Sequence, residues 1–212
     1  WYGTRIEAGY KHIFIRDIQK QWYIQGINKR INSPEKLLDF LKKECEGFRI
    51  ITVGSSAGGY AAVLYGSQLG AEKVFSFNGQ FELDSLLLTS NSRVDPLVFK
   101  MRKERKFYDL NEVIIKSVPI YYFVSIGSTW DKFELEHVKG NQNIAVIGFR
   151  TRRHGIPFVK SSLKTVINLE EEMLEKVKDR IYYPILFSIY VDGFFNTCFG
   201  LIEQIKKLGV KS

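Results

Sequence analysis

The sequence predicts an α/β fold in which a mostly parallel sheet carries helices on both faces. Short apolar runs alternate with helix-like runs along the chain, which is typical of parallel strands joined by covering helices. The 212 residues, of which 45% are hydrophobic and 25% charged, are enough for one domain with a sizeable core. We therefore expect residues 1–212 to form a single domain, with a cap insertion at about residues 80–117.

Five apolar runs are the predicted strands, and the last of them is expected to be the final strand of the sheet. They comprise residues 10–16, 48–53, 73–78, 118–125 and 143–148.

The predicted helices fill the spaces between and after these runs. Ser33, Pro34 and Glu35 begin the first one, because serine is a good N-cap, proline suits the first position and an acid suits the first turn. Gly47 is expected to end it. The other predicted helices are residues 60–69, which are apolar nearly all round, 130–139, and the charged run 169–180.

The most informative motif is Gly-x-Ser-x-Gly at residues 54–58, which follows a predicted strand and precedes a predicted helix. That context is typical of a nucleophile elbow, a tight turn that holds a serine in a strained conformation above the sheet edge. Glycines on both sides of Ser56 would prevent side-chain collisions there. The N–H of Ala57, at the positive end of the helix, could then face a developing oxyanion. The alternative is a glycine-rich turn that only joins a strand to a helix.

A nucleophilic serine needs a histidine as base, and the histidine needs a carboxylate; in such sites the acid and then the histidine follow the serine along the chain. The chain has three histidines. His12 precedes Ser56 inside a predicted strand, so we expect it to be structural. His154 follows the last predicted strand, where the base belongs, whereas His137 lies on a predicted helix. We therefore favour His154.

The acid is expected just after the strand at residues 118–125. Asp131 lies immediately beyond that strand, and Glu134 and Glu136 are the alternatives. Each of these acids could instead stabilise the start of a helix through the helix dipole.

The insertion at residues 80–117 is polar and basic, and we expect it to be mostly helical. At this point in the chain it would cover the carboxyl end of the sheet, where Ser56 is expected. An oxyanion hole also needs a second N–H donor, which we expect either upstream of Trp1 or within residues 17–23.

The net charge of +8 raises the question of a nucleic-acid partner. We expect none, because the basic residues are spread along the chain and no nucleic-acid motif is present. The densest basic cluster, residues 100–106, best fits a solvated helix face, with contact to an anionic glycan or a membrane surface as alternatives. Two distant cysteines make no disulfide framework, and no cysteine–histidine cluster predicts a metal. With no leader segment visible, we expect a cytoplasmic protein without a bound cofactor.

The region from Ile181 to Phe199 is aromatic and apolar. Its longest uncharged stretch, residues 181–191, is too short to span a bilayer. We therefore expect no integral membrane segment, and a packing helix or a homodimer surface here. An amphipathic surface anchor is the alternative.

Several segments together resemble one group of proteins. These segments are FIRD at residues 14–17, QWY at 21–23, GSSAGGYAA at 54–62, Gly66, and FSFNGQ at 75–80. They are similar to α/β-hydrolase-fold proteins found with bacterial capsule and surface-polysaccharide synthesis enzymes, and the similarity covers about residues 10–155. The chain departs from the general pattern in lacking a clear upstream oxyanion strand.

The resemblance implies an α/β-hydrolase fold and an activity. Some members of the group resemble O-acetyltransferases that use a Ser-His-Asp triad and an acetyl donor such as acetyl-CoA. Carried over by position, the triad is Ser56, Asp131 and His154, which agrees with the assignment made from the residues alone. We further expect Trp22, Tyr23 and Ser55 to contact substrate.

The leading hypothesis is a serine-dependent acyl-transfer enzyme, either an esterase or an O-acetyltransferase, that acts on a bacterial surface glycan, its precursor or a small acyl ester. A serine peptidase or lipase is a second possibility on the same fold. A non-catalytic binding or assembly subunit that keeps the hydrolase scaffold is the alternative from a different class.

Overall fold

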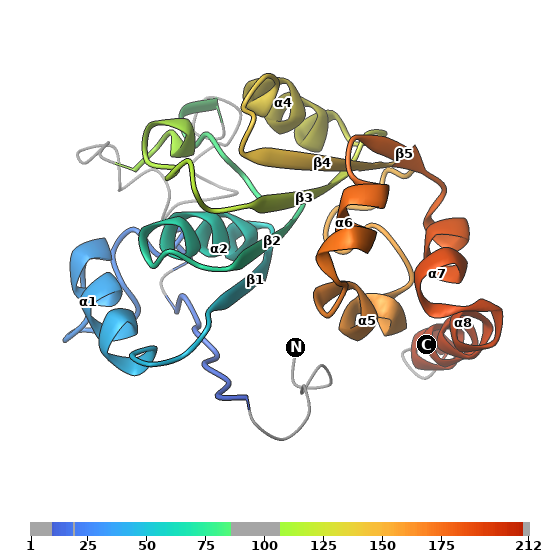
Figure 1. Ribbon diagram of the computed structural model, residues 1–212, viewed down its shortest axis with the longest axis horizontal. Helices are drawn as coiled ribbons and strands as arrows, with labels where there is room; N and C mark the ends of the chain where they lie inside the picture. Colours follow the sequence, from blue (N-terminus) through green and yellow to red (C-terminus); the bar gives the residue numbers. More distant parts are fainter. Residues whose placement is uncertain (1–9, 19, 86–106, 210–212) are drawn as a thin grey trace.

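The computed structural model describes residues 10–18, 20–85 and 107–209 (Figure 1). Five strands form one sheet in the order β1-β2-β3-β4-β5, and every neighbouring pair is parallel. The strands are β1 (Ile51–Ser55), β2 (Lys73–Phe77), β3 (Ile120–Ser125), β4 (Ile144–Phe149) and β5 (Arg180–Tyr182). The predicted α/β class with a parallel sheet is confirmed.

The helices of the described residues cover both faces of this sheet. They are α1 (Pro34–Glu44), α2 (Ala57–Gln68), α4 (Thr129–Val138), α5 (Leu163–Ile167), α6 (Glu171–Val177), α7 (Pro184–Asp192) and α8 (Phe194–Gly209), with the short 3-10 helices η3 (Leu110–Glu112) and η4 (Lys160–Ser162). Strand side chains alternate between two buried clusters. Tyr122 and Val124 of β3 pack with α1 and α2, whereas Tyr121 and Phe123 pack with α5, α6 and α7.

Many of the aromatic residues belong to the buried cluster between the sheet and α5, α6 and α7. Phe77 and Phe123 lie on adjacent strands with ring centroids 4.9 Å apart. Phe187 of α7 packs edge-on to Phe149 at 5.0 Å. Tilted and edge-to-face arrangements of this kind are favourable beyond the area that they bury, so this face of the sheet is held largely by aromatic packing.

Helix α1 begins as predicted and ends earlier than predicted. The Ser33 hydroxyl accepts a hydrogen bond from the N–H of Lys36 at 3.2 Å, and Pro34 is the first helical residue. The helix ends at Glu44, and Gly47 lies beyond it with a φ of 78°. Gly47 therefore reverses the chain after the helix instead of ending the helix itself.

The strand predicted at residues 10–16 is wrong, because no strand is assigned there. Ile13 and Ile15 pack against the core, whereas Tyr10 and Phe14 are exposed. The alternating pattern that suggested a strand thus reflects which side chains are buried. Alternating burial does not require that the backbone pairs with another strand. His12, expected inside that strand, is exposed and its ring stacks on Phe14 at 6.1 Å.

The expectation that residues 143–148 form the final strand is also wrong. The three-residue strand β5 pairs beyond β4, with Gly148 opposite Ile181. Arg180 and Ile181 are exposed, so this edge strand lacks the buried apolar run by which the other strands are recognised.

The described ends of the predicted cap insertion lie together. Glu82 and Asp109 form an isolated antiparallel bridge that joins them. Residues 86–106, which include the basic cluster at 100–106, lie outside the described residues. The prediction of a mostly helical cap concerns these residues and stays a prediction.

Within the part of the chain that the structure describes, no helix is both long enough and apolar enough to cross a bilayer. Cys45 and Cys198 are both free thiols.

Candidate functional site

The predicted site lies at the carboxyl edge of the sheet. Because the strands are parallel, the segments that follow β1, β2, β3 and β4 all leave the sheet at this edge (Figure 1). Ser56 follows β1 directly, Gln80 follows β2, Asp131 lies on α4 after β3, and His154 follows β4. This edge is the usual place for binding and catalysis in open parallel sheets.

Ser56 adopts the strained backbone of a nucleophile elbow. Its φ is 56° and its ψ is −128°, a conformation that a non-glycine residue holds only where its surroundings impose it. The N–H of Ser56 donates to the Phe77 carbonyl of β2 at 3.0 Å, and the Ser56 carbonyl accepts from Tyr60 at 3.1 Å. The turn is therefore fixed to the neighbouring strand and to the first turn of α2.

Of the two motif glycines, Gly54 and Gly58, only Gly54 prevents a side-chain collision as predicted. A Cβ on Gly54 would lie 1.8 Å from the carbonyl oxygen of Gly58, so no larger residue fits at position 54. A Cβ on Gly58 would meet nothing within 4 Å, so the expectation that Gly58 prevents a collision is wrong. Gly59 takes that place, because its Cβ would lie 2.7 Å from the Cα of Gly79; close packing of α2 on the chain after β2 requires it.

The structure brings the three predicted side chains into one hydrogen-bonded chain. His154 Nε2 lies 2.9 Å from Ser56 Oγ. His154 Nδ1 lies 2.9 Å from Asp131 Oδ1. A serine, an imidazole and a carboxylate in this order can move the serine proton to the imidazole and stabilise the imidazolium that results.

Asp131 is held in a buried position at the start of α4. The Ser128 side chain caps this helix and accepts from the N–H of Asp131 at 3.4 Å. Asp131 is 1% exposed, whereas the His154 side chain is 44% exposed. The carboxylate is thus shielded from water, and the imidazole remains open to a substrate.

The hydrogen bond that the His154 ring donates to the Asp131 carboxylate raises the pKa of His154 above its ordinary 6.5, and this exceeds the opposing effect of burial. A base must be neutral to accept a proton, so activity is expected to fall as the pH drops through that raised pKa. We predict an acid limb of kcat/KM with its midpoint above 6.5, and a lower midpoint in Asp131→Asn. A midpoint that is the same in both proteins would contradict the assigned contact.

A buried polar clamp holds the loop that carries His154. The side-chain amide of Asn78 donates to the carbonyl oxygen of Gly155 at 2.7 Å and to Ser125 Oγ at 2.9 Å. The Ser125 hydroxyl donates in turn to the carbonyl oxygen of Arg153 at 2.7 Å. The carbonyls on both sides of His154 are therefore fixed by side chains that follow β2 and end β3. Asn78 and Ser125 are both fully buried, so the clamp is rigid.

The residues from Lys20 to Tyr23 form a strained turn beside Ser56. Lys20, Trp22 and Tyr23 all have positive φ, between 50° and 60°. The Asp17 carboxylate stabilises the turn by accepting from the N–H of Gln21 at 2.5 Å and from that of Tyr23 at 3.1 Å. Strain at non-glycine residues persists where it is functionally useful, and turns of this kind direct backbone N–H groups toward anions.

A cavity of about 600 Å³ opens onto the triad. Its walls include Ser56, His154 and the predicted residues Ala57, Trp22 and Tyr23; the other lining residues are Asp17, Lys20, Gln80, Ser128 and Trp130. The predicted Ser55 is not among the residues that line this cavity; its hydroxyl faces Gly155, at 3.9 Å from where a Cβ on that glycine would lie.

Gln80 and Trp130 are among the lining residues that the sequence analysis did not assign to the site. Gln80 accepts a hydrogen bond from the Trp22 indole N–H at 3.0 Å and so connects the segment after β2 with the strained turn. Trp130 directly precedes Asp131 and is 53% exposed. The signal available in the sequence for Trp130 was its position directly before the candidate acid.

The alternative acids and base have partners elsewhere. His137 Nε2 lies 2.9 Å from Asp109 Oδ1. Glu134 accepts from the N–H of Phe81 at 2.7 Å, and burial raises the pKa of Glu134 from 4.5 to about 7. Glu136 pairs with Lys139 at 3.3 Å on the surface. The geometry thus favours His154 and Asp131 over these alternatives.

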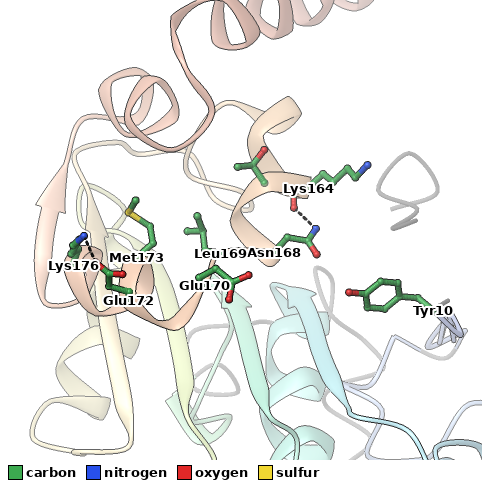
Figure 2. Close-up of a pocket in the computed structure, with 9 residues that line it drawn as sticks. Tyr10, Lys164, Asn168, Leu169, Glu170, Glu172, Met173 and Lys176 are labelled. Atoms are coloured by element: carbon green, nitrogen blue, oxygen red, sulfur yellow. Dashed lines mark hydrogen bonds and ion pairs between the residues drawn. The ribbon is translucent and has the colours of Figure 1, made fainter. Parts of the chain in front are cut away.

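A larger cavity of about 750 Å³ lies away from the triad (Figure 2). Figure 2 shows its lining residues, most of them from the region of α5 and α6, with Tyr10 on the opposite side. One of them, Leu169, accepts a hydrogen bond from Lys73, the first residue of β2, so the cavity lies toward the amino edge of the sheet. Lys176 and Glu172 at its rim neutralise each other at 2.6 Å. Among the described residues that line it there is no serine, cysteine or histidine, and hence no imidazole that could act as a base.

Among the described residues, no group of three or more histidine, cysteine, aspartate or glutamate side chains could hold a metal ion.

Comparisons with known proteins assign no function to the site. No protein-family model matches the chain, and no curated protein matches it. One solved structure, that of a protein with unknown function from Staphylococcus aureus subsp. aureus Mu50, is similar with a TM-score of 0.48 and 13% sequence identity. The likeness covers 69% of this chain and 71% of that chain.

Proposed function

We propose that this chain is a serine-dependent acyl-transfer enzyme of the α/β-hydrolase type. The observation that carries the proposal is the continuous chain from Ser56 through His154 to the buried Asp131, with 2.9 Å at both contacts. The strained φ of Ser56 supports it, because a turn that only joins a strand to a helix does not need such strain.

In the proposed mechanism Ser56 Oγ attacks the carbonyl carbon of an ester or thioester while His154 Nε2 takes the hydroxyl proton. Asp131 accepts the Nδ1–H of the imidazolium. The tetrahedral intermediate then collapses, its bond to the alcohol or thiol breaks, and His154 returns the proton to that leaving group. In the second half, His154 deprotonates water or an acceptor hydroxyl, which attacks the acyl-enzyme. The bond between the acyl carbon and Ser56 Oγ then breaks, and His154 returns the proton to Ser56 Oγ.

The oxyanion of the intermediate needs two N–H donors. Ala57 is the first residue of α2, so its N–H has no partner within the helix, and Ala57 lines the cavity. In the strained turn the N–H groups of Gln21 and Tyr23 donate to Asp17, so we assign the second donor to the N–H of Lys20 or Trp22, both of which line the cavity. This choice agrees with one of the two locations expected from the sequence.

The walls of the cavity support a glycan or an anionic acyl ester as substrate. Trp22 and Trp130 offer flat aromatic surfaces for a sugar ring or an acyl chain, and the charges of Lys20 and Asp17 in the walls offset each other. Arg152 and Arg153 are exposed immediately before His154. A cationic rim would attract an anionic glycan or the phosphates of acetyl-CoA, so we propose a bacterial surface glycan or its precursor as acceptor.

A fluorophosphonate probe tests the proposed nucleophile directly. We expect one adduct, on Ser56, because the probe reacts with serines that an imidazole has activated. The adduct is mapped by mass spectrometry of the digested protein. His154→Ala is expected to lose nearly all labelling, and Ser55→Ala, at the neighbouring serine, is the matched control that retains it. An unlabelled wild-type protein would favour a non-catalytic binding subunit.

A further inference from the structure

Helix α8 turns its apolar side away from the domain. Phe194, Phe195, Phe199, Ile202 and Ile205 are all exposed, and Phe195 is 85% exposed. At 3.6 residues per turn these five side chains lie within an arc of about 140°. Amphipathic helices of globular proteins usually bury such a stripe. We call these five residues the α8 apolar face.

The opposite side of α8 fixes this orientation. Thr197 is fully buried, and a Cβ on Gly200 would lie 1.8 Å from Ser161 Oγ in η4. The small side of the helix therefore packs so closely against η4 that no rotation can bring Phe195 or Phe199 into the core. Their exposure follows from the packing of the domain.

The neighbouring elements extend the exposed surface. Figure 1 shows β5, α7 and α8 in succession at one end of the molecule, and α7 packs against α8. Exposed apolar side chains continue there at Ile181, Tyr183, Ile185, Leu186 and Tyr190. The exposed fractions of all ten residues add to about six whole side chains, or on the order of 1,000 Å². A standard interface needs about 800 Å² from each partner.

We propose that the α8 apolar face, with the exposed residues of α7, is a dimer interface between two copies of this chain. Phe195, Cys198, Ile202 and Ile205 repeat at intervals of three, four and three residues, the spacing of a coiled-coil seam. Such a seam can pair with itself across a two-fold axis, because each copy presents the same patch to the other.

Charge favours a second copy over a membrane surface. From Arg180 to Gly209, the span of β5, α7 and α8, the sequence contains two acids, Asp192 and Glu203, and three bases, Arg180, Lys206 and Lys207. Helices that lie on membranes carry lysine and arginine beside the apolar stripe and are drawn to anionic lipids. With a net charge of only +1 over these 30 residues, the surface lacks the row of basic residues that such a helix carries. Aromatic and aliphatic side chains with few charges are typical of the centre of protein interfaces.

The interface would leave the candidate active site open. The described residues that line the cavity at Ser56 come from other parts of the fold than α7 and α8. Dimerisation can therefore be tested separately from the proposed activity.

Sedimentation velocity of the full chain tests the proposal. We expect the wild-type protein to sediment as a dimer at micromolar concentration, and Phe195→Ser/Phe199→Ser to sediment as a monomer with an unchanged circular dichroism spectrum, because both rings are exposed and neither supports the core. The matched control is Phe133→Ser on α4, where the ring is 51% exposed; this variant should remain dimeric.

Chemical crosslinking gives a second readout that needs no interface substitution. Cys198 lies on the same side of α8 as the apolar face, so a short bis-maleimide should join two copies of the Cys45→Ser variant and none of the variant that also lacks Cys198. A monomeric wild-type protein, or a dimer that survives the double substitution, overturns the proposal. Flotation of a monomeric protein with phosphatidylglycerol vesicles, lost in Phe195→Ser/Phe199→Ser, would also overturn it and would assign the face to a membrane.

Discussion

Replacing Ser56 with alanine is expected to lower the rate of acyl transfer by on the order of 10³-fold or more. The substitution removes the only atom that can form the acyl-enzyme, and His154 is then left without the proton that it is placed to receive at 2.9 Å. The backbone of position 56 is already strained at a φ of 56°, so alanine inherits that strain and adds none of its own.

The measurement is release of free thiol from acetyl-CoA, or of alcohol from a small acetyl ester, with and without added polysaccharide. Ser55→Ala is the control, because Ser55 has no place in the triad. Stimulation of the wild-type rate by the polysaccharide indicates transfer, and a rate indifferent to it indicates hydrolysis. A loss of less than tenfold in Ser56→Ala would falsify the assignment of Ser56 as nucleophile.

Asp131→Asn is expected to lower the rate by on the order of 10³- to 10⁴-fold. An asparagine fills the same space, but its amide cannot stabilise a positive imidazolium and can donate to Nδ1, which favours the wrong tautomer of His154. The effect should appear mainly in kcat and not in KM, because Asp131 is 1% exposed and does not line the cavity.

Glu134→Gln is the matched control for this acid. Glu134 is also buried on α4, one turn after Asp131, and it accepts backbone N–H bonds that a glutamine oxygen can accept as well. We expect its rate to change by about tenfold at most, or about 1.4 kcal/mol. Equal losses in both variants would show that α4 needs any buried acid for its structure, and that Asp131 has no special part in the chemistry.

The sequence predicted the sheet wherever the strands are buried on both faces. The runs that became β2, β3 and β4 are apolar on both sides, since helices cover both, and such runs are visible without knowledge of their partners. β5 was missed because it is three residues long and mostly exposed. Residues 10–16 show the alternation of a strand, but their backbone is not paired in the sheet. Pairing depends on hydrogen bonds to a distant segment, and local alternation of side chains does not reveal whether that segment is present.

For the candidate site, too, some features could be predicted from the sequence and others only from the tertiary structure. The chain itself determined which serine stands at a strand-to-helix turn, and the order of acid and histidine along it limited the choices to a few side chains; these are properties of local spacing. Only the tertiary structure decided that Asp131 and not Glu134 reaches His154, that Asn78 and Ser125 hold the histidine loop, and that Phe195 and Phe199 face outward. Those outcomes depend on which elements pack against each other, because the contacts join residues that are distant in the chain and share no spacing by which they could be recognised.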